Sequence, residues 1–158
     1  MPPTDPTPPG LRTLLGFQFA KCGSWLERRL ETALEPVGLR VRHFLVLAML
    51  DAAGALSQQE MSGHLSLDPT LMVAVVDELE RRELIVRARD PRDRRRYAVS
   101  ITPAGREAVA TARSIADAVG DEVFSPLTKA ERRQLAELIG KVMGPYWSDR
   151  RASGGAGG

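Results

Sequence analysis

Apolar residues along most of the chain recur at three- and four-residue spacing, which predicts helices. The first predicted helix runs from about Leu11 to Leu34 and ends at Pro36 and Gly38. A second covers roughly Val41–Ala53 and stops at Gly54. The first half of the first helix is apolar on two sides and therefore needs two partners. We expect one side to face its own domain and the other a second subunit.

Two shorter helices follow, and each carries its own start signal. The S-x-x-E pattern at 57–60 is a capping box, which opens a helix that lasts to about Leu65. Asp68 is a good N-cap and Pro69 suits the first helical position, so a fourth helix is predicted from there to about Arg82. Two compact helices joined by a short turn are typical of a helix-turn-helix.

The pattern then changes to alternation, which predicts two strands at Leu84–Arg89 and Tyr97–Thr102. Tyr97, Val99 and Ile101 are expected to face inward, and the polar segment DPRDRRR at 90–96 forms the hairpin tip. A hairpin directly after a helix-turn-helix is the outline of a wing.

Two further helices complete the chain. Thr102-Pro103 begins one that reaches about Phe124, and a capping box at Thr128 and Glu131 begins the last. Long helices at both ends would leave apolar faces uncovered in a monomer, so we expect them to intertwine with a symmetric copy. The expected fold is mainly α with a small β-hairpin wing: a winged helix-turn-helix with terminal dimerisation helices. The expected regions are a disordered tail at 1–10, a dimerisation region at 11–36 and 103–147, a DNA-binding region at 39–102 and a flexible tail at 148–158.

Charge is distributed unevenly along the chain. The formal net charge is +2, but residues 87–96 contain six arginines against two aspartates and thus carry +4. The rest of the chain is slightly acidic. A local basic patch favours one docking edge for a polyanion.

Several classes of protein are not expected. No apolar run approaches the roughly 20 residues of a membrane span, and the N-terminus lacks the features of a secretory signal. The single Cys22 cannot form an internal disulfide, so we expect a cytoplasmic protein. Two histidines and one cysteine do not supply a usual metal site, and no nucleophile–base pair or glycine-rich phosphate loop is present. We expect neither an enzyme nor a cofactor.

The chain resembles the MarR family of bacterial transcription regulators over roughly residues 12–143. The resemblance is carried by 39–44, by LSQQEMSGHLSLDPTLMVAVVDELERREL, by DPRDRRRY and by the SITPAG that follows. It implies a homodimer built from the terminal helices. It also implies that the fourth helix enters the major groove of a pseudo-palindromic operator in double-stranded DNA, with the wing over the minor groove.

The candidate DNA contacts lie on three elements. The first two turns of the fourth helix, Pro69–Val76, hold no charge, whereas residues 68–83 together carry −3. Only the N-terminal end of this helix could therefore enter a groove comfortably. Its buried face should be Met72, Val75, Val76 and Leu79, which leaves Thr70, Leu71, Val73 and Ala74 for the bases. The other expected contacts are Gln58 and Gln59 to phosphate, Arg94 in the minor groove, and Arg92, Arg95 and Arg96 to phosphates or as braces.

This chain departs from the family at the fourth helix. Many members have an arginine where it has Ala74, and a glycine where it has Glu83. Loss of a bidentate donor weakens direct base readout and leaves more to the wing and to DNA shape. We expect a repressor that answers to a small molecule. The alternatives are a winged-helix protein-interaction module that has lost sequence-specific binding, and a non-sequence-specific DNA binder.

The resemblance also implies a pocket for a small aromatic or amphipathic effector between the dimerisation helices and the winged region. Trp25, Arg28, His43 and Phe44 lie on the first two helices and would suit an aromatic carboxylate. Ordinary packing is the alternative for the aromatic residues. Cys22 could be a redox sensor, but it also lies on the apolar stripe, where cysteine behaves as a small hydrophobe.

Overall fold

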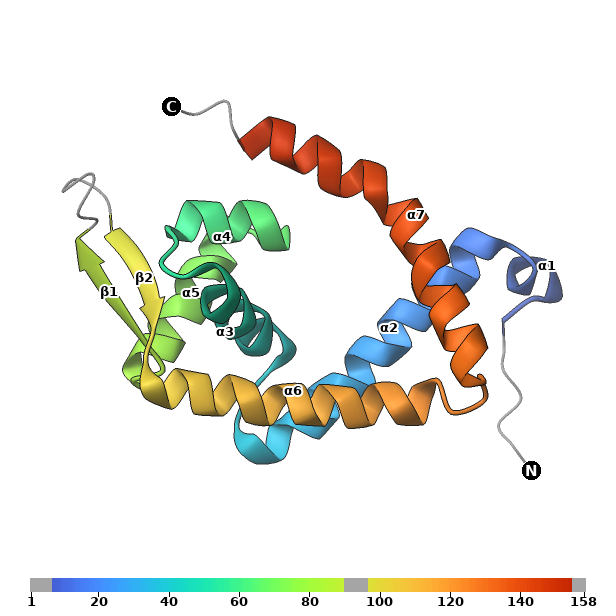
Figure 1. Cartoon of the computed structure of the whole chain (residues 1–158), viewed down its shortest axis with the longest axis horizontal. Coiled ribbons are helices and arrows are strands. Elements are labelled where there is room, and N and C mark those ends of the chain that lie inside the picture. Colours follow the sequence, from blue (N-terminus) through green and yellow to red (C-terminus); the bar gives the residue numbers. More distant parts are fainter. Residues whose placement is uncertain (1–6, 90–96, 155–158) are drawn as a thin grey trace.

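The computed structural model describes residues 7–89 and 97–154, and Figure 1 shows how its elements are arranged. Helices dominate, with one two-stranded antiparallel sheet, so the predicted fold class is confirmed. The elements are α1 (Pro9–Arg12), α2 (Leu15–Leu34), the 3-10 helix η1 (Glu35–Val37), α3 (Val41–Ala53), α4 (Gln58–Leu65), α5 (Pro69–Arg81), β1 (Ile85–Arg89), β2 (Tyr97–Ile101), α6 (Pro103–Val123) and α7 (Lys129–Gly154).

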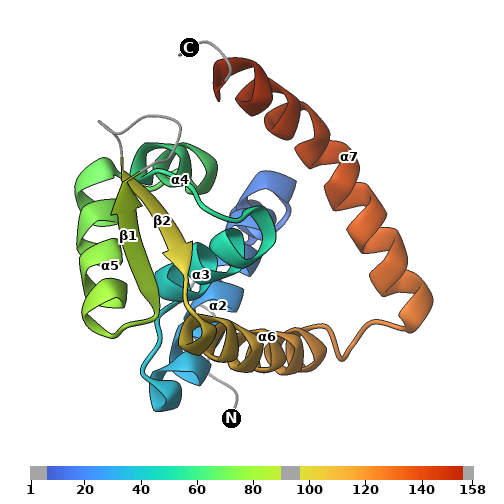
Figure 2. The same ribbon diagram turned by 60° about the vertical axis from the view of Figure 1, so that its left-hand side comes forward.

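A compact unit of α3, α4, α5 and the β1–β2 hairpin stands at one end of the molecule (Figure 1). The long helices α2 and α6 lie against each other beside this unit. From the far end of α6, α7 runs back as an arm whose C-terminal part approaches α4, as both ribbon views show (Figure 2). The hydroxyls of Ser66 and Tyr146 lie 2.9 Å apart at this approach.

The core lies where α3, α5 and the hairpin meet α2 and α6. Each of these elements, together with α4, contributes side chains that are almost fully buried. They include Leu34, Val46, Leu47, Leu50, Met61, Met72, Val75, Val76, Leu79, Ile85, Val99, Val109 and Ala112. The predicted inner face of α5 is confirmed at all four of its positions. Burial of this face holds α5 against the rest of the unit, since most helical stability in proteins comes from such packing.

The predicted starts of α4, α5 and α7 are confirmed by their capping contacts. Ser57 and Glu60 cap each other's backbone at α4, and Thr128 and Glu131 do the same at α7. The Asp68 carboxylate accepts hydrogen bonds from the backbone N–H groups of residues 70 and 71 at the start of α5. These contacts satisfy N–H groups that have no partner inside the helix, and they form between residues close in sequence.

The predicted first helix is wrong in its continuity. Leu14 is extended, with ψ of 112°, and separates a single turn, α1, from α2. The side-chain amide of Gln18 donates to the carbonyl of Arg12, which satisfies the end of that turn. Pro9 begins α1, so the expected disordered tail at 1–10 is wrong for its last two residues; residues 1–6 lie outside the described part.

Two other expectations are corrected. The last helix continues through Pro145 to Gly154, although a flexible tail was expected from residue 148. Tyr97 is half exposed and is not buried as expected, because its partner across the sheet is Arg89, at the outer end of the hairpin and beyond the core. The Arg89 guanidinium lies 4.5 Å from the centroid of the Tyr97 ring, a cation–π contact.

Candidate nucleic-acid interface

The exposed side of α5 has an uncharged N-terminal half. Thr70, Val73 and Ala74 are exposed, and 46% of the Val73 surface is accessible. Leu71 is half-buried and packs against the core. Three of the four residues predicted for base contact thus share one exposed face, whereas Leu71 is partly covered by the core.

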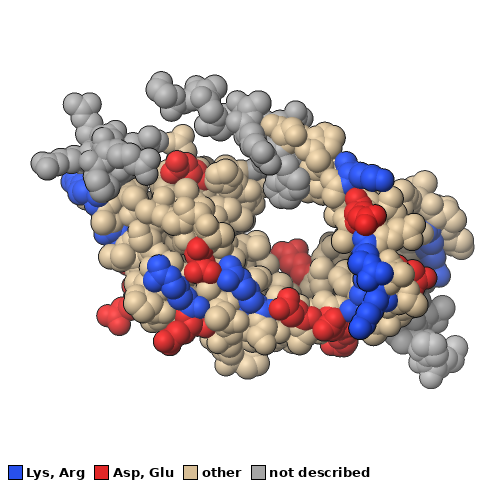
Figure 3. Space-filling view, viewed as in Figure 1, with Lys and Arg blue, Asp and Glu red and all other residues tan. Residues whose placement is uncertain are grey.

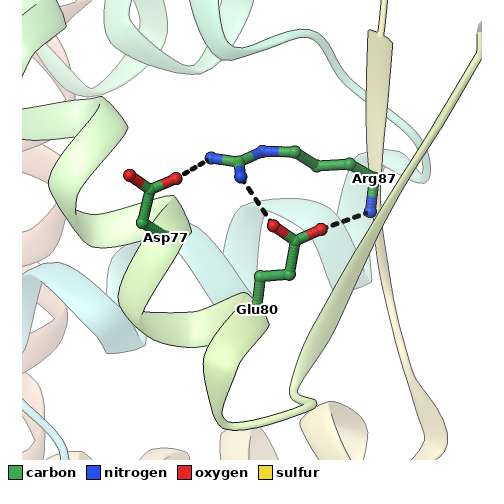
Figure 4. A network of polar contacts seen from close by, with 3 residues as sticks. All are labelled: Asp77, Glu80 and Arg87. Carbon is green, nitrogen blue, oxygen red and sulfur yellow. Dashed lines mark hydrogen bonds and ion pairs between the residues drawn. The ribbon is translucent and has the colours of Figure 1, made fainter.

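The acidic residues of α5 point to neighbours within the fold. Asp77 and Glu80 both pair with Arg87 of β1, as Figure 4 shows. Glu78 lies 3.2 Å from Nε2 of the buried His43 on α3. Arg87 therefore offsets part of the net negative charge that the sequence places on this helix, and all three carboxylates have partners within the fold.

The hairpin that follows α5 has a regular register. Its pairs run from Ile85 opposite Ile101 to Arg89 opposite Tyr97. Leu56 adds two backbone hydrogen bonds to Val99, of 3.1 and 2.8 Å, and so ties β2 to the segment before α4. The tip, with Arg92, Arg94, Arg95 and Arg96, lies outside the described residues, so their contacts stay predictions.

The two glutamines that begin α4 differ in exposure. Gln59 is exposed, whereas Gln58 is half-buried and its Nε2 has no hydrogen-bond partner in the described part of the chain. Ser57 is occupied by the capping box. Gln59 is therefore the better placed of the two for a phosphate, and both assignments stay predictions.

Comparison with known proteins gives a consistent result. Residues 39–97 match the family model described as MarR family. A crystal structure of a MarR family transcriptional regulator from Rhodococcus sp. RHA1 is 30% identical, with a TM-score of 0.73 over 81% of this chain and 92% of that one. The chain belongs to the MarR family. The predicted identification and the winged helix-turn-helix fold are thereby confirmed.

Two other relatives are a transcriptional repressor and a protein solved with a bound ligand. CouR from Rhodococcus jostii RHA1, solved with bound p-coumaroyl-CoA, is 32% identical, with a TM-score of 0.73 over 84% of this chain and 93% of that one. The HTH-type transcriptional repressor Rv2887 of Mycobacterium tuberculosis is 27% identical over 81% of this chain and 92% of its own length. Its complex with salicylic acid gives a TM-score of 0.71, covering 82% of this chain and 96% of that one.

The departure from the MarR pattern at Glu83 has a visible backbone consequence. Glu83 adopts a φ of +59°, in the left-handed region that favours glycine. Its N–H donates to the Glu80 carbonyl, and its own carbonyl accepts from the Thr102 hydroxyl at 2.8 Å. The turn from α5 to β1 is thus closed by hydrogen bonds at both backbone groups, so the fold keeps the conformation although the residue is not glycine.

The four residues predicted for an effector lie in different surroundings. Trp25 and Arg28 are exposed on α2, and Phe44 is half-buried against the core. His43 is buried: its Nδ1 accepts from the Arg40 N–H at 3.2 Å, and its Nε2 faces Glu78. Burial lowers the pKa of His43, and the carboxylate of Glu78 opposes part of that change. The position of His43 is thus explained by packing, and the effector role of all four stays a prediction.

Two shallow cavities occur elsewhere, and neither includes those four residues. One, of about 230 Å³, lies between α2 and α6 beside the Arg29–Glu122 ion pair. The other, of about 350 Å³, is near α1 and is lined in part by Phe17 and Lys21. Cys22 is exposed on α2, and its redox role stays a prediction.

Other kinds of site were sought in the same residues. Within 7–89 and 97–154, no three potential metal-ligating side chains gather, and no helix is long and apolar enough to cross a bilayer. Sequence reasoning missed the roles of Asp77, Glu80 and Arg87. It counted Arg87 with the basic wing. The strand alternation that turns Arg87 to the side of Ile85 could have indicated that it faces α5.

Proposed function

We propose that the protein is a homodimeric transcription regulator, a repressor, that binds double-stranded DNA and responds to a small aromatic molecule. The observation that carries the proposal is the uncharged, exposed N-terminal half of α5, supported by α4 and followed at once by a hairpin. In this arrangement α5 enters the major groove by its N-terminal half, and the wing, which is the hairpin β1–β2 with residues 90–96, follows the minor groove. The DNA-binding region is 39–102.

Base readout on α5 is apolar in character. Thr70, Val73 and Ala74 offer methyl groups to thymine and, apart from the Thr70 hydroxyl, no hydrogen-bond donor to a base edge. Discrimination on this helix is therefore soft, and affinity rests on the arginines of the wing together with Gln59 and Gln58 at phosphates. A steep decrease of affinity with salt is expected, because phosphate contacts release counterions.

Selection of bound sequences from a random pool of DNA duplexes tests this function. The expected result is enrichment of a pseudo-palindrome with loosely specified half-sites. Arg94→Ala should then weaken binding and lower the salt dependence of affinity by about one counterion. Arg113→Ala is a matched control, since it removes an arginine that pairs with Asp51 at 2.8 Å, away from α5 and the hairpin. A pool that shows no enrichment would refute the proposal.

Dimerisation through 11–36 and 103–147 is supported by apolar side chains that the monomer leaves uncovered. Leu15 is 78% exposed and Val142 71%, and Phe19, Trp25 and Leu138 are about half exposed. Figure 3 shows an opening through the molecule beside the α7 arm, which a second copy would fill. Large uncovered apolar faces mark interaction surfaces. Sedimentation of the wild type should give a dimer, and Leu15→Glu with Val142→Glu a monomer.

An aromatic carboxylic acid, free or as a thioester, is the proposed effector. The bound salicylic acid of Rv2887 and the p-coumaroyl-CoA of CouR support this class. Trp25, Arg28, His43 and Phe44 remain the proposed contacts. Salicylate should release DNA in a binding assay, and Arg28→Met should raise the concentration required without changing DNA affinity.

A protein-interaction module that has lost specific DNA binding is the second candidate. The acidic residues of α5 favour it, because they would oppose approach to a polyanion. Their pairing within the fold weakens that objection. Unchanged behaviour of Arg94→Ala in every DNA assay, with no enriched sequence, would favour this second candidate.

A further inference from the structure

Arg87 is the point on which two acidic side chains of α5 converge (Figure 4). Its Nη1 lies 2.6 Å from Oε2 of Glu80, and its Nη2 pairs with Oδ1 of Asp77. The other oxygen of Glu80 accepts from the backbone N–H of Arg87 at 3.3 Å. One arginine thus binds two carboxylates of the proposed recognition helix, and no other partner of either carboxylate occurs among the described residues.

The strand places this guanidinium on the inner side of the hairpin. Arg87 follows Ile85 by two residues and therefore points to the same face of β1, opposite the fully buried Val99. The side chain is only 23% exposed, compared with 54% for Asp77 and 38% for Glu80. Arg87 is therefore committed to α5 and is not available as a free cation on the outer surface of the wing.

The position of Asp77 gives this pairing a functional meaning. Asp77 lies three and four residues after Ala74 and Val73, so it continues the exposed face that the proposed function assigns to the major groove. Without a counter-charge, Asp77 and the neighbouring Glu80 would place two negative charges close to DNA phosphates. Like charges brought together across an interface oppose binding strongly.

We propose that Arg87 is a positioning residue that offsets the negative charge of Asp77 and Glu80, so that an acidic recognition helix can approach DNA, and that it does not itself contact DNA. This inference rests on the proposed function, since it assigns a role within that interface. It separates Arg87, which acts on α5, from the arginines at the tip of the hairpin, which act on DNA.

The test compares neutral variants of the three residues by their affinity for the DNA that the wild type selects. Arg87→Met removes the charge and keeps the apolar stem, and it should weaken binding about tenfold or more at low salt. The triple variant D77N/E80Q/R87M removes all three charges, and it should return to within about threefold of the wild type. D77N/E80Q with Arg87 intact should bind at least as tightly as the wild type, and Arg87→Lys should keep most of the affinity.

The controls separate this role from others. Arg113→Met removes one charge from the Asp51 ion pair outside α5 and the hairpin, and it should bind within about twofold of the wild type. A triple variant as weak as Arg87→Met would overturn the inference, because a direct phosphate contact or a purely structural brace is not rescued by removing the carboxylates. Thermal unfolding of each variant confirms that it is folded at the assay temperature. A wild type that binds no DNA would refute the proposed function and this inference together, whereas a binding wild type with an unrescued triple variant refutes this inference alone.

Discussion

Glu83 provides a direct test of the turn between α5 and β1, because its backbone is left-handed while its side chain is exposed. A left-handed conformation costs a residue with a Cβ about 1–2 kcal/mol. Glycine removes that cost but loses more freedom on folding, which returns roughly 0.5–1 kcal/mol. Glu83→Gly should therefore raise the free energy of unfolding by about 0.5–1 kcal/mol, or the melting temperature by roughly 1–4 °C for a chain of this size.

Calorimetry or circular dichroism melting at one fixed protein concentration would measure the change. Glu83→Ala separates backbone from charge: it removes the carboxylate but keeps a Cβ, so it should leave stability almost unchanged. Glu107→Gly is the matched control in the interior of α6, where glycine should lower stability by about 1 kcal/mol or less. If Glu83→Ala stabilises as much as Glu83→Gly, the gain comes from charge and the reasoning from φ is refuted.

Three further predictions concern single positions. Gly105→Ala should lower the free energy of unfolding by about 2 kcal/mol or more, because the added Cβ would overlap the Leu84 carbonyl oxygen and lie 2.7 Å from Ile101. Denaturant unfolding measures this loss, and an unchanged free energy of unfolding would mean that α6 shifts freely. The pKa of His43 is lowered in the folded protein, so stability should be complete above about pH 6.5 and fall as the pH drops through that value. His43→Gln should reduce this dependence of stability on pH, and an equally steep dependence in the variant would assign it to other groups. Ser57→Ala removes the α4 cap and should cost about 1 kcal/mol in thermal unfolding, whereas an unchanged melting temperature would show that the box contributes nothing.

Much of the interface could be predicted from the sequence, because the signals involved are local. The starts of α4 and α5 follow from capping residues and the end of α3 from Gly54, and these signals act through hydrogen bonds within four residues. The buried face of α5 follows from the helical spacing of its apolar residues, and the remaining positions form its exposed face. The effector residues were less predictable. His43 was chosen for its chemistry, yet its place is explained by burial between α3 and α5.

The sequence by itself determined the order of the elements, the winged helix-turn-helix and the uncharged end of α5, since each follows from the spacing of residue types along the chain and from helix-capping residues. Only the tertiary structure decided where the charges go. Arg87 belongs to a basic run in the sequence, but the strand turns it onto Asp77 and Glu80, ten and seven residues away. Tyr97 is half exposed although it follows the inward alternation, because the core ends before the tip of the hairpin. Such outcomes depend on how a strand and a helix pack together, which no local pattern encodes.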